Sequence, residues 1–193
     1  VNALGRMGLA DEIQPGRWIL RSDAEQILSD LETRGDIIKS VHRAMAGKGW
    51  EADLSKVAIH ACTPAEQILG RLAARGFQDE LSGAAYAIVE AVDGRTHHLR
   101  FSSIDATGDT PVGGIVELHN RTDRTGRQHS ALKGRSDLCL ADQVSSRGAT
   151  WLDQQLAAQP PVPLGSGFGR EVAQALQDRT DRLVELGLAS RRA

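Results

Sequence analysis

The residues whose types and spacing most suggest chemistry are five basic side chains in the second half of the chain: Arg121, Arg124, Arg127, Lys133 and Arg135. Asp123 is the only acidic residue in this stretch. Guanidinium and ammonium groups bind phosphate oxygens, so the cluster predicts contact with a nucleic-acid backbone. A solvated loop without a partner would have the same composition. The stretch also lacks aromatic side chains on which bases could stack, which disfavours single-strand binding.

Metal binding is the second chemistry to consider, because the chain contains six histidines: His42, His60, His97, His98, His119 and His129. His97 and His98 are adjacent in an expected strand, so their side chains point to opposite faces of a sheet. His98 and His119 would meet only if their strands pair, and no carboxylate or cysteine accompanies them at a ligand spacing. We therefore predict no metal site and no cofactor.

Catalysis is not indicated by the motifs in the sequence. There is no G-x-G-x-x-G, Walker or G-x-S-x-G pattern. The glycine-rich segment 165–169 precedes a helix, where an anion could bind, but it lacks the lysine of a phosphate-binding loop. Tyr86 lies inside an expected strand, and no pairing of Cys62 or Cys139 with a histidine stands out. We predict that this chain is non-catalytic.

The composition is that of a globular protein with one medium domain or two small ones. Hydrophobic residues make up 40% of the 193 residues, aromatic residues 4% and charged residues 25%. Residues 1–120 carry a net charge of −5 and residues 121–193 one of +3, so the total of −2 gives no overall positive field. Two distant cysteines and the lack of an apolar run of about 18 residues predict a cytoplasmic protein outside the membrane.

The elements expected in residues 1–50 are a helix end, a hairpin and a helical pair. Gly8 is expected to stop the first helix, and Pro15-Gly16 predicts a turn before a short strand at 17–20. This order is that of the wing in a winged-helix domain. Ser22 and Glu25 form a capping-box pattern at the start of a helix that we expect to end at Gly35. A second helix at 37–46 is expected to end at Gly47.

The pattern changes from helical to alternating in residues 51–120. Short strands are expected at 57–59, 68–74, 84–92, 95–101 and 114–119. Asp93-Gly94 predicts a two-residue hairpin turn in which both residues have positive φ. Several short strands in this length predict a small β-barrel of SH3-like or OB-like kind.

Residues 121–193 are expected to contain the basic loop, taken as 120–135, and then helices. A helix is expected at 138–148, another beginning at Thr150, a proline- and glycine-rich linker at 159–169, and a long amphipathic helix from Phe168. The pattern L-x-x-[ML]-G-L-A occurs at residues 4–10 and again at 183–189. It indicates either coincidence or a second winged-helix-like start. The predicted fold class is α+β, with a central barrel between winged-helix-like segments.

Short motifs spread along the chain resemble, in their order, a known region of plasmid proteins. They are Gly8-Leu9-Ala10, Pro15-Gly16-Arg17-Trp18, Arg34-Gly35-Asp36-Ile37-Ile38, Ile68-Leu69-Gly70-Arg71-Leu72-Ala73-Ala74-Arg75-Gly76, Asp79-Glu80-Leu81, Val92-Asp93-Gly94-Arg95-Thr96-His97-His98, Gly148-Ala149-Thr150-Trp151-Leu152-Asp153, Gly167-Phe168-Gly169 and Gly187-Leu188-Ala189. The region that they resemble follows the nuclease domain in conjugative relaxase and mobilization proteins, and its function is unknown.

The resemblance implies a bacterial parent protein that nicks DNA at a transfer origin with a tyrosine and a histidine-bound metal. This sequence shows no three-histidine motif, and Tyr86 is in the wrong context to be the nucleophile. Because the chain begins at Val1 in patterned sequence, we expect the nuclease domain to lie upstream.

Three functions remain open at this point. The chain is an accessory relaxase region that binds DNA or the relaxosome, a translocation signal read by the type IV secretion coupling protein, or a structural spacer.

Overall fold

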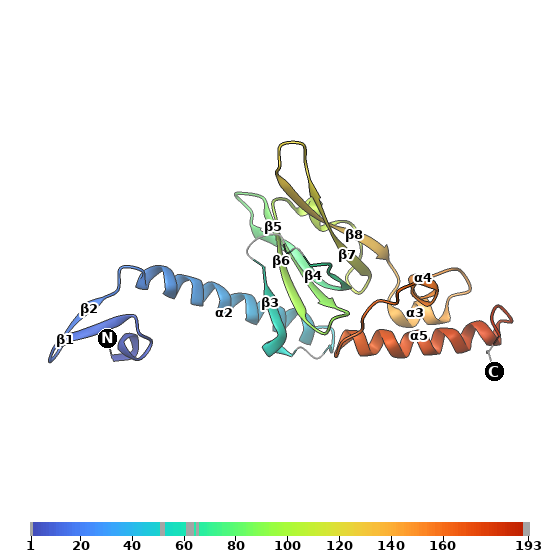
Figure 1. The fold of residues 1–193 in the computed structure, drawn as a ribbon, viewed down its shortest axis with the longest axis horizontal. Coiled ribbons are helices and arrows are strands. Elements are labelled where there is room, and N and C mark those ends of the chain that lie inside the picture. The colour runs from blue at the N-terminus through green and yellow to red at the C-terminus, as the bar shows by residue number, and fades with distance from the viewer. Residues whose placement is uncertain (1, 51–52, 61–63, 65, 191–193) are drawn as a thin grey trace. The chain divides into compact units, whose positions relative to one another are not determined.

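The chain folds into a mixed α+β structure with five α-helices and eight strands among its described residues (Figure 1). The computed structural model describes residues 2–50, 53–60, 64 and 66–190. Two units can be distinguished, residues 1–40 and residues 41–193. In chain order the elements are α1 (Asn2–Arg6), β1 (Ala10–Gln14), β2 (Arg17–Leu20), α2 (Ala24–Ala46), η1 (Leu54–Lys56), β3 (Val57–Ile59), β4 (Leu69–Asp79), β5 (Ala84–Ala91), β6 (Thr96–Phe101), η2 (Ile104–Thr107), β7 (Ile115–Thr122), β8 (Gln128–Ser136), α3 (Leu140–Ser145), α4 (Trp151–Ala157) and α5 (Phe168–Glu185).

The hairpin expected near the start of the chain is present. β1 and β2 pair antiparallel, with Ala10 opposite Leu20, and the turn lies at Pro15-Gly16 as predicted. The start of α2 differs from the expected capping box. The carbonyl of Asp23, not that of Ser22, accepts the first helical hydrogen bond, from the amide of Ile27.

α2 is one continuous helix of 23 residues, so the expected helical pair is wrong. Gly35 is partly buried, but a Cβ atom there would meet nothing within 4 Å. A glycine in a helix interior costs only about 1 kcal/mol relative to alanine, which is too little to end a helix that tertiary contacts stabilise. The helix ends at Ala46, before Gly47 as expected, and beyond it the Trp50 amide donates to the carbonyl of Met45 and Gly49 has a φ of +69°.

The repeated L-x-x-[ML]-G-L-A pattern forms the same helix ending at both places. After α1, the amide of Leu9 donates to the carbonyl of Leu4 over 2.9 Å. After α5, the amide of Leu188 donates to the carbonyl of Leu183, also over 2.9 Å. The intervening glycine has a φ near +70° in each case, as the Schellman motif requires. The two copies of the pattern therefore have the same C-terminal helix cap.

The second unit is built on a six-stranded sheet of strand order β3-β6-β5-β4-β7-β8. Adjacent strands are antiparallel except for β3, which runs parallel to β6. β3 and β8 lie at opposite edges, so the sheet is open and the expected closed barrel is wrong. The sheet extends to Ser136 and so spans residue 120, where we expected a domain boundary. The β5–β6 hairpin is present, but only Gly94 in its turn has positive φ, because four residues rather than two lie between the strands.

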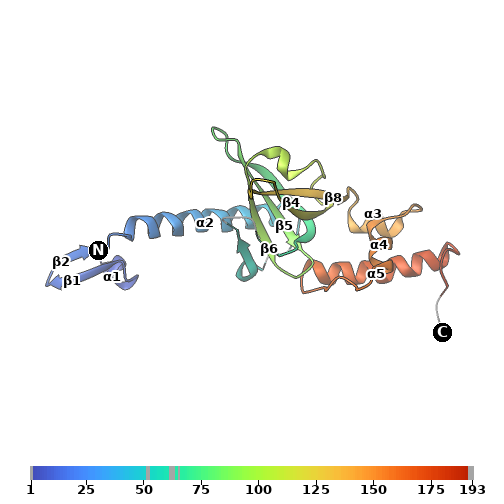
Figure 2. The ribbon, with the colours of Figure 1, turned by 45° about the horizontal axis from the view of Figure 1, so that its top comes forward.

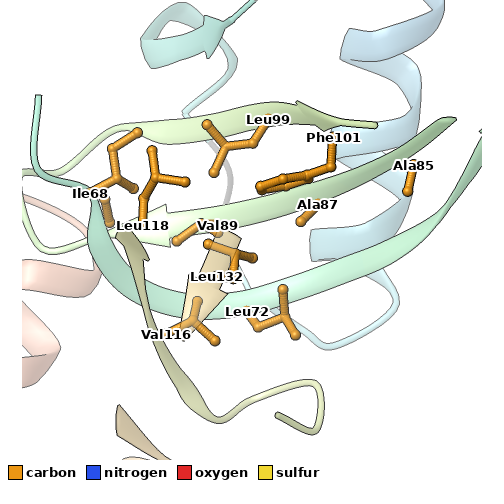
Figure 3. Close-up of a cluster of buried hydrophobic side chains, with 11 residues drawn as sticks. Ile68, Leu72, Ala85, Ala87, Val89, Leu99, Phe101, Val116, Leu118 and Leu132 are labelled. Carbon is orange, nitrogen blue, oxygen red and sulfur yellow. The ribbon is translucent and has the colours of Figure 1, made fainter. Parts of the chain in front are cut away.

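One face of the sheet carries an apolar cluster whose side chains point toward one another (Figure 3). Its members come from alternate positions of β4 to β8 and from the residue just before β4: Ile68, Leu72, Ala85, Ala87, Val89, Ala91, Leu99, Phe101, Val116, Leu118 and Leu132. For β4 to β7 the alternation is the period of two that the sequence predicted, whereas β8 was expected to be part of a loop.

A second cluster joins the intervening positions of the sheet to the C-terminal helices, which lie together beside it (Figure 2). Leu69 and Ile115 contribute from the strands, Trp151 from α4, and Phe168 and Val172 from α5. Within the described residues, no helix has the length and apolar character needed to cross a lipid bilayer.

Candidate functional site

The segment that we expected to be a basic loop is a β-hairpin made of β7 and β8. β7 pairs with β4 only from Ile115 to Glu117, whereas β7 and β8 remain paired with each other as far as Thr122 and Gln128. Among the described residues, the strand pairing beyond Leu118 and Leu132 is therefore between β7 and β8 alone. The hairpin projects beyond the sheet as a two-stranded ribbon (Figure 1).

The turn at the end of this ribbon is organised by the carboxylate of Asp123. Its Oδ1 accepts hydrogen bonds from the backbone amides of Thr125 and Arg127 and from the Thr125 hydroxyl, at 2.8, 3.0 and 2.6 Å. Its Oδ2 lies 2.9 Å from Nε2 of His129. The Thr125 hydroxyl, followed by His129, holds the pKa of Asp123 far below its ordinary value. The turn is therefore ordered by a carboxylate that remains ionised.

Three of the five basic residues are gathered at the tip of the ribbon. Arg121 lies in β7, opposite His129, and Arg124 and Arg127 lie in the turn. All three are exposed, and none forms an ion pair with another described residue. The tip therefore presents three guanidinium groups with free donors to the solvent.

The other two basic residues lie at the base of the ribbon, close to an acidic side chain. Lys133 is directly opposite Glu117 in the β7–β8 register. Nε of Arg135 lies 3.5 Å from Oε2 of Glu117. At a rise of about 3.3 Å per residue, Lys133 is roughly 20 Å along the strand from Arg127. The structure thus divides the predicted cluster into an unpaired tip and a partly neutralised base.

A second group of titratable side chains lies at the edge formed by β3 and β6. One ligand atom from each of His60, His97 and Glu66 lies within 4.8 Å of the other two. Nε2 of His60 is 2.9 Å from Nδ1 of His97 and 3.9 Å from Oε1 of Glu66. Burial lowers the pKa of both histidines, although nearby carboxylates oppose this shift.

The sequence did not reveal this group because its members are brought together by a parallel strand pair that is distant in sequence. Ala58 lies opposite His97 in the β3–β6 register, and the amide of His60 donates to the carbonyl of His98. The pair considered from the sequence, His98 and His119, is not brought together, because β6 and β7 are separated by two strands. The expected strand at 57–59 was the only available signal.

A third feature is a buried arginine that joins the sheet to α5. Arg71 lies 2.5 Å from Glu90 and 3.0 Å from Glu171, and its guanidinium packs between the rings of Trp50 and Phe168. Burial raises the pKa of Glu90, and the hydrogen bond from Arg71 opposes that shift. A cleft of about 480 Å³ lies beside this network. Both carboxylates accept from Arg71, so the network ties the sheet to α5.

The chain matches one family model over residues 1–129 and again over residues 119–193. That model describes a protein of unknown function, DUF3363. The chain belongs to the DUF3363 family. No curated protein and no solved structure matches it significantly. The family membership therefore covers both the ribbon and the histidine group without assigning a role to either.

Proposed function

We propose that this region binds the phosphate backbone of DNA through the tip of the β7–β8 ribbon, as a non-catalytic accessory part of a bacterial conjugative relaxase. The observation that carries the proposal is the set of three exposed, unpaired arginines at the end of a ribbon that projects from the sheet. A two-stranded ribbon fits the major groove of B-DNA, which is about 12 Å wide. Arginines at its tip would then contact phosphates on either side.

The order of the first elements adds a second contact surface to the proposal. A helix followed by a hairpin, as in α1, β1 and β2, is the order of a winged-helix domain, in which the hairpin is the wing. Arg17 is exposed in this hairpin. We propose the wing as an auxiliary phosphate contact and the β7–β8 ribbon as the principal one.

The test is a titration of this chain with a labelled DNA duplex at several salt concentrations. Three phosphate contacts should give a slope of log K against log salt of about −2.7, because each contact contributes about −0.9. The double variant Arg124→Glu with Arg127→Glu should weaken binding strongly and flatten the slope. The matched control is Arg170→Glu with Arg182→Glu, which makes the same charge change on α5, at the exposed Arg170 and the partly buried Arg182.

Two results would count against the proposal. One is the lack of any binding at low salt, and the other is an equal loss in the ribbon variant and in the α5 control. The same ribbon variant can be placed in a full-length relaxase and scored for conjugative transfer. If transfer falls while DNA binding does not change, recognition by the secretion coupling protein becomes the better explanation. If neither changes, the region is a spacer.

A further inference from the structure

We propose that His60, His97 and Glu66 bind a divalent transition-metal ion, such as Zn²⁺, at the edge of the sheet where β3 pairs with β6. This inference is independent of the proposed DNA contact, because none of the three residues belongs to the β7–β8 ribbon. Two imidazole nitrogens and one carboxylate oxygen are a donor set that such ions prefer.

The spacing of the donor atoms is close to that of a coordinated ion. In a tetrahedral site with ligand distances of about 2.0–2.2 Å, neighbouring donors are roughly 3.3 Å apart. The corresponding distances from His60 Nε2 are 2.9 Å to His97 and 3.9 Å to Glu66. Without an ion, the two rings share a hydrogen bond over the shorter distance.

A carboxylate behind His97 supplies the support that histidine ligands usually have. The second ring nitrogen of His97, Nε2, lies 3.4 Å from Oδ2 of Asp93. Asp93 is itself oriented by the β5–β6 turn, where its Oδ1 accepts from the amide of Arg95 over 2.9 Å. When Asp93 holds the proton on Nε2 of His97, Nδ1 carries the lone pair that can ligate a metal ion, and Nδ1 is the nitrogen that faces His60. This is the carboxylate–histidine arrangement found behind many zinc ligands.

The burial of the group fits an ion that enters from one side. His97 is completely buried, and the His60 side chain is 15% exposed, so strand pairing restricts both rings. The Glu66 side chain is 47% exposed, and its second oxygen lies 3.9 Å from a guanidinium nitrogen of Arg95. Three protein ligands with an exposed side leave a coordination position for water or another ligand.

The test uses the whole chain after treatment with a chelator, followed by titration with Zn²⁺ in a calorimeter and with Co²⁺ in a spectrophotometer. We expect one equivalent of Zn²⁺ to bind, a rise in the melting temperature, and visible Co²⁺ bands of a site with nitrogen and oxygen ligands. Glu66→Gln and His60→Gln should each weaken Zn²⁺ binding at least 10-fold. Asp93→Asn should weaken it by about 10- to 100-fold, as changes behind a ligand do.

Two control variants separate this site from other donors. His129→Ala removes an exposed histidine of the ribbon tip, and Cys139→Ser removes an exposed thiol. Both should bind Zn²⁺ as the parent chain does. Because Glu66 is half-exposed, Glu66→Gln should fold normally and keeps the test decisive even if a histidine variant unfolds. Failure to bind one equivalent would overturn the proposal, as would unchanged binding in both Glu66→Gln and His60→Gln.

Discussion

Replacement of Arg179 by methionine should unfold the C-terminal helices at a markedly lower urea concentration. Arg179 lies in α5 and is 1% exposed. All five of its N–H groups donate hydrogen bonds, two to the carboxylate of Asp153 and three to the carbonyls of Val144, Ser146 and Gly148. It thereby joins α5 to α4, to the end of α3 and to the loop between α3 and α4. Methionine keeps the apolar stem and removes every donor.

The expected loss in the free energy of unfolding is about 3–5 kcal/mol, the usual cost of removing one partner from a buried ion pair. The lower end applies here, because the Asp153 side chain is 23% exposed and still accepts from Thr150. With a urea m-value of about 2 kcal/mol/M, 3 kcal/mol corresponds to a midpoint shift of about 1.5 M. Arg179→Lys, which keeps the charge but has only three donors, should fall between the parent and the methionine variant.

Urea titrations followed by tryptophan fluorescence measure this shift, since Trp151 of α4 is 2% exposed. A Trp18→Phe background removes the tryptophan of the unit formed by residues 1–40. Arg182→Met on the same helix is the control, because its i,i+3 pair with Glu185 is partly exposed and contributes less than about 0.5 kcal/mol. If Arg179→Met costs less than about 1 kcal/mol, similar to the control, the assignment of this network as the tie between the helices is wrong.

Three further predictions test the sheet, the ribbon turn and the ion pair. Gly70→Ala should lower the melting temperature by the equivalent of about 1–3 kcal/mol, because its Cβ would meet the backbone of β5. The control Gly35→Ala should raise the melting temperature, because a Cβ on this helical glycine meets no neighbour and alanine has the higher helix propensity. Asp123→Ala should speed hydrogen exchange of the Thr125 and Arg127 amides, which donate hydrogen bonds to its carboxylate. Unchanged exchange would show that the backbone alone holds the turn. Arg179 lowers the pKa of Asp153 from 3.8, so the stabilisation from this pair is present above that pH and is lost as the pH falls below it. The difference in unfolding free energy between the parent and Arg179→Met should therefore shrink at low pH. A constant difference down to pH 2 would contradict this prediction.

How much of the fold the sequence predicted depended on whether a signal was local. The alternation around Leu72 and Val89, and the turns at Pro15-Gly16 and Asp93-Gly94, identified strands and hairpins that the structure contains. The β7–β8 hairpin was missed because, among its described residues, none beyond Leu118 and Leu132 contributes to the buried core. Its outer half is polar on both faces, so it lacks the alternation by which a half-buried strand is recognised.

The candidate sites show the same division. The tip arginines were found because they are close in sequence, and the structure adds that Lys133 and Arg135 do not belong with them. The histidine group was missed because His60 and His97 are brought together only by the parallel pairing of β3 with β6. A parallel pair has no connecting turn whose residues could identify it.

The repeated L-x-x-[ML]-G-L-A pattern bears on the strength of the DNA-binding proposal. Two copies suggested two winged-helix-like units, and hence two surfaces of a DNA-binding type. The same hydrogen bond from an amide to the carbonyl five residues earlier also ends α2, at Trp50, where the sequence lacks the pattern. A geometry that recurs without the repeat is a property of helix ends, so the copy at 183–189 gives no independent support for a second wing. The DNA-binding proposal therefore depends mainly on the arginines of the ribbon tip, and charge reversal at Arg124 and Arg127 is its decisive test.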